Sequence, residues 1–150
     1  MRQNQSKPIL KFKKLYDDAR LPKRATPDSA CLDVYAHGTY DVYSHLVSTP
    51  AMIGTGVAMD IPKGYHVEVY LRSGVAAKTF LRLANSVGII DSDYKGELKL
   101  IVDNIGRGVY TIHDGDRIAQ IKLVKDAVFD VEEVDEISES THGGFGSTGR

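Results

Sequence analysis

Short runs of apolar and β-branched residues, each closed by Gly, Pro, Asp or Asn, recur along almost the whole chain. In residues 66–71 and 118–123 apolar and polar side chains alternate strictly, which places one face on a core and the other toward solvent or a partner. The pattern predicts an all-β sandwich or barrel. Only residues 75–80 favour a short helix. The predicted strands are 10–15, 31–36, 57–61, 66–71, 98–102, 109–112 and 118–124.

The charge and composition exclude several classes of function. The chain has 150 residues, typical of one domain, and its 19 basic and 20 acidic residues give no overall attraction to nucleic acid. Its apolar runs are far shorter than the ~20 residues of a membrane span, and residues 1–8 lack the apolar core of a signal peptide. Cys31 is the only cysteine, which fits a reducing compartment. We therefore expect a soluble, cytoplasmic protein without nucleic-acid or membrane partners.

Residues 88–97 join an apolar strand end to two acids, a tyrosine and a second glycine. Ile89 and Ile90 fit a buried strand end, residues 91–93 favour a turn, and Gly96 favours a backbone position with positive φ. The simplest interpretation is a β-hairpin. The functional alternative is a site built at this turn.

A possible anion site precedes the predicted helix. Arg72, Ser73 and Gly74 follow a strand end, and exposed amides together with the positive end of the helix dipole attract phosphate. The structural alternative is that Ser73 only caps the helix while Arg72 forms a salt bridge.

Two further segments carry polar groups in strand-like surroundings. Asp33 lies within an apolar strand, where an unpaired carboxylate is costly to bury, so it needs an internal base or a metal-bound water as partner. Asp116 and Arg117 are a potential ion pair, and the amide of Gln120 can donate to an anion. The alternative for this second segment is a turn followed by an ordinary strand.

The chain ends in a segment that cannot build a core. We predict a β-domain over residues 1–134 and a mobile, Gly-rich tail over 135–150, or else a disordered terminus. The tail glycines formally match a dinucleotide fingerprint, but that fingerprint needs a strand before it and a helix after it, a context we do not expect here. Ser147 and Thr148 can bind phosphate oxygens, and Phe145 can stack on a base.

Taken together and in order, five segments resemble the five motifs of the trimeric dUTPase family. The resemblance implies a jelly-roll-like subunit, three of which share active sites, and hydrolysis of dUTP to dUMP and pyrophosphate with Mg²⁺. That reaction limits uracil incorporation into DNA and supplies dUMP for dTMP synthesis. The segments are residues 29–34, 71–78, 88–97, 115–120 and 143–149.

The resemblance also implies roles for individual residues. Asp91 would orient and activate the attacking water, Tyr94 would pack on the deoxyribose and exclude a 2′-hydroxyl, and Asn85 would read uracil. Asp33 would contact the metal through water. The other implied substrate-binding residues are Arg72, Ser73, Gly74, Gly88, Ile90, Lys99, Gln120, Phe145, Gly146, Ser147 and Thr148.

The sequence departs from the family pattern at its end. Ser140 stands where the tail motif normally carries an arginine for the terminal phosphate, and a serine cannot provide a bidentate cation. This departure predicts weaker tail closure and a higher Michaelis constant, unless Arg150, Arg107 or Lys78 supplies the charge. Two alternatives stay open: a dCTP deaminase of the same fold, and a non-enzymatic dUTP sensor acting on an unknown regulatory protein partner.

Overall fold

The computed structural model describes residues 7–138. These residues form ten strands and one short helix, joined by turns and loops. The elements are β1 (Lys11–Lys14), β2 (Leu32–Tyr35), β3 (Tyr40–Tyr43), β4 (Ala51–Asp60), β5 (Tyr65–Leu71), α1 (Ser73–Lys78), β6 (Leu81–Leu83), β7 (Gly88–Ile90), β8 (Glu97–Asn104), β9 (Val109–Ile112) and β10 (Arg117–Lys125).

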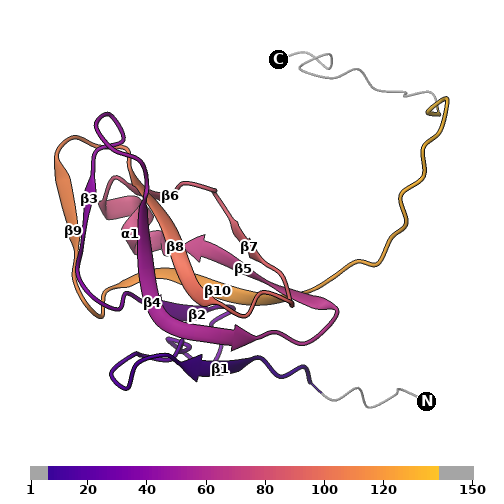
Figure 1. Cartoon of the computed structure of the whole chain (residues 1–150), viewed down its shortest axis with the longest axis horizontal. Coiled ribbons are helices and arrows are strands. Elements are labelled where there is room, and N and C mark those ends of the chain that lie inside the picture. Colours follow the sequence, from indigo (N-terminus) through magenta and orange to yellow (C-terminus); the bar gives the residue numbers. More distant parts are fainter. Residues whose placement is uncertain (1–6, 139–150) are drawn as a thin grey trace.

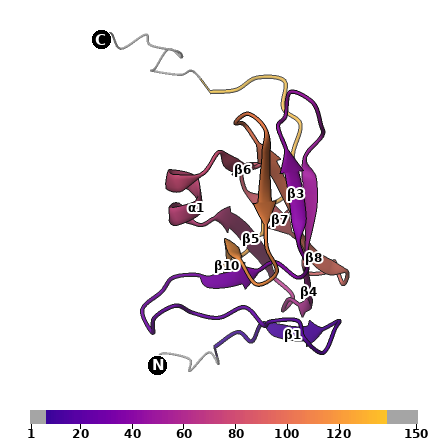
Figure 2. The ribbon, with the colours of Figure 1, turned by 90° about the vertical axis from the view of Figure 1, so that its left-hand side faces the viewer.

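The strands form two four-stranded antiparallel sheets, ordered β1-β4-β8-β6 and β2-β10-β5-β7, and a two-stranded ribbon of β3 and β9 (Figures 1 and 2). One apolar cluster joins the two sheets: Ile53 and Leu100 of the first sheet and Val67 and Ile121 of the second are almost fully buried. Each such side chain contributes about 1.5–3 kcal/mol by leaving water. The architecture confirms the predicted all-β fold.

Strand β4 is longer than the sequence predicted, because the chain passes through two glycines instead of ending at them. Its pairing with β8 shifts register between Gly54 and Ala58, and Gly56 between them has a φ of 68°. A Cβ atom at Gly56 would lie 2.8 Å from the Cβ of Ala19. The Glu97 carboxylate accepts the Gly56 amide at 2.9 Å. Glycines inside a strand pattern thus mark a bulge here, not a strand end.

Two short strands were not predicted, and the helix begins and ends two residues earlier than predicted. Strands β3 and β6 have four and three residues, and each pairs with a longer-range partner, β3 with β9 and β6 with β8. The helix α1 covers residues 73–78 instead of 75–80. It ends where the Thr79 hydroxyl donates to the Val75 carbonyl at 2.7 Å.

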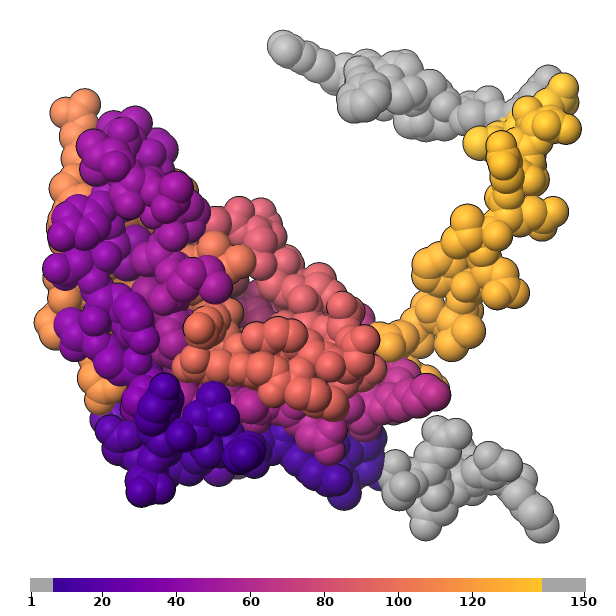
Figure 3. Space-filling model, in the orientation of Figure 1, coloured from indigo at the N-terminus to yellow at the C-terminus, as the bar shows by residue number. Residues whose placement is uncertain are grey.

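After β10 the chain leaves the sandwich. Residues 126–138 contain no strand and run away from both sheets (Figures 1 and 3). Large apolar side chains on this segment are exposed, among them Val128, Phe129, Val131 and Ile137. No helix within residues 7–138 is long and apolar enough to cross a bilayer.

Candidate active site

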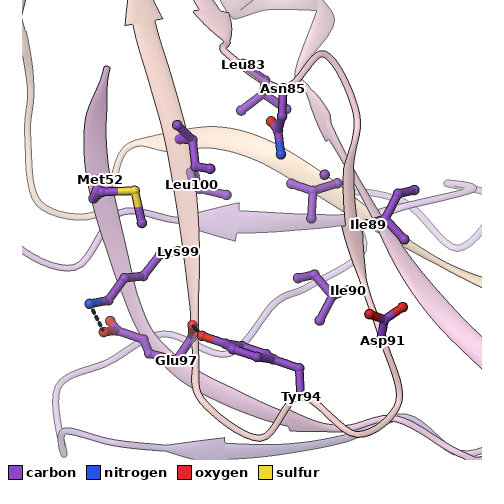
Figure 4. Close-up of a pocket in the computed structure, with 13 residues that line it drawn as sticks. Met52, Leu83, Asn85, Ile89, Ile90, Asp91, Tyr94, Glu97, Lys99 and Leu100 are labelled. Atoms are coloured by element: carbon purple, nitrogen blue, oxygen red, sulfur yellow. Dashed lines mark hydrogen bonds and ion pairs between the residues drawn. The ribbon is translucent and has the colours of Figure 1, made fainter. Parts of the chain in front are cut away.

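A cavity of about 250 Å³ opens between β7, the turn after it and the first half of β8 (Figure 4). Strands β4, β5 and β6 complete its walls with apolar side chains. The predicted site residues that line the cavity are Asn85, Gly88, Ile90, Asp91, Tyr94 and Lys99, and its other lining residues are Met52, Val69, Leu83, Ile89, Glu97, Leu100 and Ile101.

The turn that carries the predicted catalytic acid is not a β-hairpin. Strand β7 pairs with β5, whereas β8 pairs with β4 and β6, so residues 91–96 cross from one sheet to the other. The Tyr94 amide donates to the Asp91 carbonyl at 3.1 Å and closes the turn. Ile89, predicted to be buried, is 57% exposed, because it pairs with Glu68 on the outer face of its sheet.

Two contacts hold the hydroxyl end of the Tyr94 side chain. Its hydroxyl donates to the Glu97 carbonyl at 2.9 Å, and its ring lies against Gly96. A Cβ atom at residue 96 would lie 2.6 Å from the tyrosine oxygen. Gly96 does not adopt the positive φ predicted for it. A side chain at residue 96 would displace the Tyr94 ring from its present position.

Polar groups on the cavity walls come from residues near and far in the sequence. The Asn85 amide points into the cavity (Figure 4), and Gly88 lies between it and the Val69 side chain, where a Cβ atom would lie 3.1 Å from the Cβ of Val69. The Lys99 ammonium lies 3.7 Å from the Glu97 carboxylate, which is itself only 19% exposed. Sequence reasoning missed Glu97 as a lining residue. The available signal was its place directly after Gly96.

A second polar cluster surrounds Asp33, whose side chain is 9% exposed. Its carboxylate accepts from Arg72 Nε at 3.0 Å and from Arg117 Nη1 at 3.3 Å. The expected partner of this buried acid is therefore an internal base. The predicted Asp116–Arg117 pair was wrong: Arg117 turns to Asp33, and Asp116 accepts the amide of His113 at 2.9 Å.

The remaining predicted phosphate ligands lie beside this cluster. Gln120 pairs with Asp33 across β10 and β2, and its amide donates to the Leu71 carbonyl at 3.4 Å. The salt bridge predicted for Arg72 is confirmed, but Ser73 does not cap α1: the N-cap residue is Arg72, without a side-chain hydrogen bond. None of Asp33, Arg72, Ser73, Gly74 and Gln120 lines the cavity.

The remaining predictions concern the tail and the metal. Phe145, Gly146, Ser147 and Thr148 lie outside the described residues, as does Ser140. Within residues 7–138, no group of three or more His, Cys, Asp or Glu side chains converges to hold a metal ion. A metal bound here would need oxygen ligands from its substrate and from water.

The antiparallel β-sandwich thus has a carboxylate and a tyrosine at the mouth of a cavity, and a separate cluster of cationic and amide groups. These groups are of the kinds that nucleotide-binding proteins use. The family model described as dUTPase matches residues 17–149. The chain belongs to the dUTPase family, whose class of enzyme is dUTP diphosphatase.

Individual relatives are similar in sequence to most of this chain. The deoxyuridine 5′-triphosphate nucleotidohydrolase of Anaplasma marginale is 42% identical, over 86% of this chain and 88% of the relative. The enzyme of the same name from Helicobacter hepaticus is 40% identical, over 93% of this chain and 88% of the relative. Both matches extend well beyond the residues that line the cavity.

Solved structures of dUTPases have a similar fold. The Staphylococcus bacteriophage 80alpha dUTPase with dUPNHPP has a TM-score of 0.83 and 29% identity, covering 94% of this chain and 98% of the phage chain. A mutant dUTPase from phage phi11 of S. aureus, described with a structural Mg(II) ion, has a TM-score of 0.78 and 27% identity, covering 87% and 99%. The predicted jelly-roll-like fold is thus confirmed.

Proposed function

We propose that this protein hydrolyses dUTP to dUMP and pyrophosphate, with Asp91 orienting and activating the water that attacks the α-phosphorus. The observation that carries the proposal is the cavity itself, which has the Asp91 carboxylate and the Tyr94 ring at its mouth and the Asn85 amide inside. In the cell this reaction would limit uracil incorporation into DNA and supply dUMP for dTMP synthesis. The single cysteine, Cys31, supports a cytoplasmic location.

The cavity residues suit a pyrimidine deoxynucleoside. A primary amide both donates and accepts, so Asn85 can match the alternating acceptors and donor on the edge of uracil. The hydrogen bond from Tyr94 to the Glu97 carbonyl and its contact with Gly96 keep the tyrosine ring beside the cavity. A ribose 2′-hydroxyl would therefore meet the face of this ring. This placement supports Tyr94 as the residue that excludes ribonucleotides.

The phosphate chain needs residues outside this cavity. About 250 Å³ lies at the small end of ligand pockets, which fits a nucleoside better than a whole triphosphate. We assign the phosphates to Arg72, Ser73, Gly74 and Gln120, with Asp33 holding the Arg72 guanidinium in a fixed orientation. Because these residues do not line the cavity of their own chain, the proposal includes active sites shared between the subunits of a homotrimer.

The exposed arm after β10 supports the same assembly. Residues 126–138 leave their own sandwich with apolar side chains uncovered, and an arm of this kind can carry the tail to a neighbouring subunit. We assign Phe145 to base stacking, and Gly146, Ser147 and Thr148 to the terminal phosphate. The division between a β-domain ending at residue 134 and the tail remains part of this proposal.

The reaction needs no covalent intermediate. The water oxygen bonds to the α-phosphorus, the bond from that phosphorus to the oxygen bridging the α- and β-phosphates breaks, and Asp91 accepts the water proton. A carboxylate is a weak base, so much of the acceleration must come from aimed donors such as Ser73, each worth roughly 10²–10³ in rate. Mg²⁺ would neutralise the triphosphate and fix its shape, held mainly by phosphate oxygens and water. Asp33 fits a water-mediated contact, since both its oxygens already accept from guanidinium groups.

The direct test is pyrophosphate release by the purified protein with Mg²⁺ and, separately, dUTP, dCTP, dTTP or UTP. We expect rapid release from dUTP alone. Binding of dUTP without turnover would instead indicate a sensor, and loss of ammonia from dCTP would indicate a deaminase.

The Ser140→Arg variant tests the altered tail motif. We expect the KM for dUTP to fall by roughly tenfold, because a guanidinium adds a charge-assisted hydrogen bond to the terminal phosphate. The matched control is Ser138→Arg, which adds the same charge two residues earlier. Unchanged KM in Ser140→Arg, or an equal gain in the control, would count against a direct phosphate contact.

A further inference from the structure

One lysine fastens the turn that carries Asp91 and Tyr94. The Lys95 ammonium donates to the Ser92 carbonyl inside the turn at 2.7 Å, and to Asp60 Oδ1 at the end of β4 at 2.8 Å. The turn is therefore linked to a strand that lies 35 residues earlier in the chain.

Asp60 is itself held from a second direction. It pairs with Lys11 of β1 in the sheet register, and the Lys11 ammonium lies 3.6 Å from its other carboxylate oxygen. The hydrogen bond from Lys95, followed by the Lys95 charge, lowers the pKa of Asp60 below its ordinary value. The carboxylate thus stays ionised, and able to hold Lys95, at any pH near neutrality.

The turn depends on such contacts because it has little else to hold it. Every residue from Asp91 to Gly96 is exposed except Ser92, which is half-buried, so no buried side chain anchors the segment. The Tyr94 amide donates to the Asp91 carbonyl within the turn, and the Tyr94 hydroxyl donates to the Glu97 carbonyl at the adjoining end of β8, so neither bond reaches a strand distant in sequence. The Lys95–Asp60 contact does fix the turn to such a strand.

We propose that Lys95 is a positioning residue for dUTP hydrolysis, with Asp60 as its anchor; the inference rests on the proposed role of Asp91. Exposed ion pairs contribute little to the free energy of unfolding. A displacement of about 1 Å in a reacting group can nevertheless cost roughly 10² in rate. Loss of the Lys95 contact therefore lowers turnover while leaving the fold intact, a separation that a merely structural contact would not produce.

The experiment compares Lys95→Met with Lys95→Arg, whose guanidinium can donate to both acceptors, and with Lys11→Met as the matched control. The control removes the other lysine of Asp60 but does not touch the turn. In Lys95→Met we expect kcat for dUTP to fall about tenfold with KM changed less than about twofold. Lys95→Arg should retain most of the activity. In Lys11→Met kcat should stay within about twofold of wild type.

A second readout does not depend on activity. Amide hydrogen exchange of residues 92–96 should be faster in Lys95→Met and unchanged in Lys11→Met. Asp60→Asn should also lower kcat, and combined with Lys95→Met it should add nothing further, because the two residues act through one contact.

The possible failures are distinguishable. A wild-type protein that does not hydrolyse dUTP overturns the proposed function, while hydrogen exchange still decides whether Lys95 fastens the turn. Wild-type kcat in Lys95→Met, an equal loss in Lys11→Met, or unchanged exchange at residues 92–96 overturns the positioning role.

Discussion

Asp91→Asn is expected to lower kcat for dUTP by roughly 10²–10⁴, the range attributed to a positioned general base. Asparagine keeps the shape of the side chain but cannot take a proton from water. Asp91 is exposed at the mouth of the cavity, so its replacement should leave the fold and dUTP binding intact. Single-turnover release of pyrophosphate measures the first effect, and calorimetric titration with a non-hydrolysable dUTP analogue measures the second.

The matched control is Asp93→Asn, which makes the same change two residues later in the same turn. Asp93 is exposed and does not line the cavity, so its kcat should stay near the wild-type value. Full activity in Asp91→Asn, or equal losses in both variants, would remove Asp91 from the role of base.

Asp33→Ala is expected to reduce both stability and turnover. The alanine leaves the guanidinium groups of Arg72 and Arg117 without the carboxylate that they share. Breaking a fully buried ion pair typically costs 3–5 kcal/mol; Arg117 is half exposed, so we expect a loss of about 2–3 kcal/mol in the free energy of unfolding. The released Arg72 should also raise the KM for dUTP. Denaturant unfolding at one fixed protein concentration measures the stability term, because assembly couples to folding.

Asp116→Ala is the control for this variant. Asp116 adjoins Arg117 in sequence, but its carboxylate accepts a single backbone amide from His113 at an exposed turn. Its removal should cost less than about 1.5 kcal/mol and leave KM unchanged. Equal destabilisation by the two substitutions would show that the Asp33 cluster contributes no more to the free energy of unfolding than a single exposed hydrogen bond.

The sequence predicted those strands whose burial is one-sided. Residues 66–71 and 118–124 correspond closely to β5 and β10, because the core between the two sheets buries one face of each strand and leaves the other face more open. The apolar pattern did not predict a strand correctly where the local composition interrupts a segment that strand pairing keeps extended. Gly54 and Gly56 interrupt the apolar pattern of β4, yet the strand continues, because a bulge and the Glu97 carboxylate accommodate them.

The candidate site also has a part that was predicted from the sequence and a part that was not. Residues 88–97 predicted a site at a turn, since acids, a tyrosine and glycines are adjacent in sequence, and the structure places this turn beside a cavity. The partners of that turn were not predictable, because they depend on sheet register. Met52 reaches the cavity through the pairing of β4 with β8, and Asp60 reaches Lys95 only because β4 ends beside the turn. Long-range pairing is not encoded in any window of ten residues.

The crossing of residues 91–96 between the two sheets has a consequence for how the enzyme tolerates change. Asp91 follows a strand of one sheet, whereas Glu97 and Lys99 belong to the other, so the width of the cavity is set by the spacing of the sheets. A conservative core substitution such as Ile121→Val, remote from the nucleotide, can thus lower kcat while the protein stays folded. We therefore expect substitutions in this sandwich core to affect turnover as well as stability.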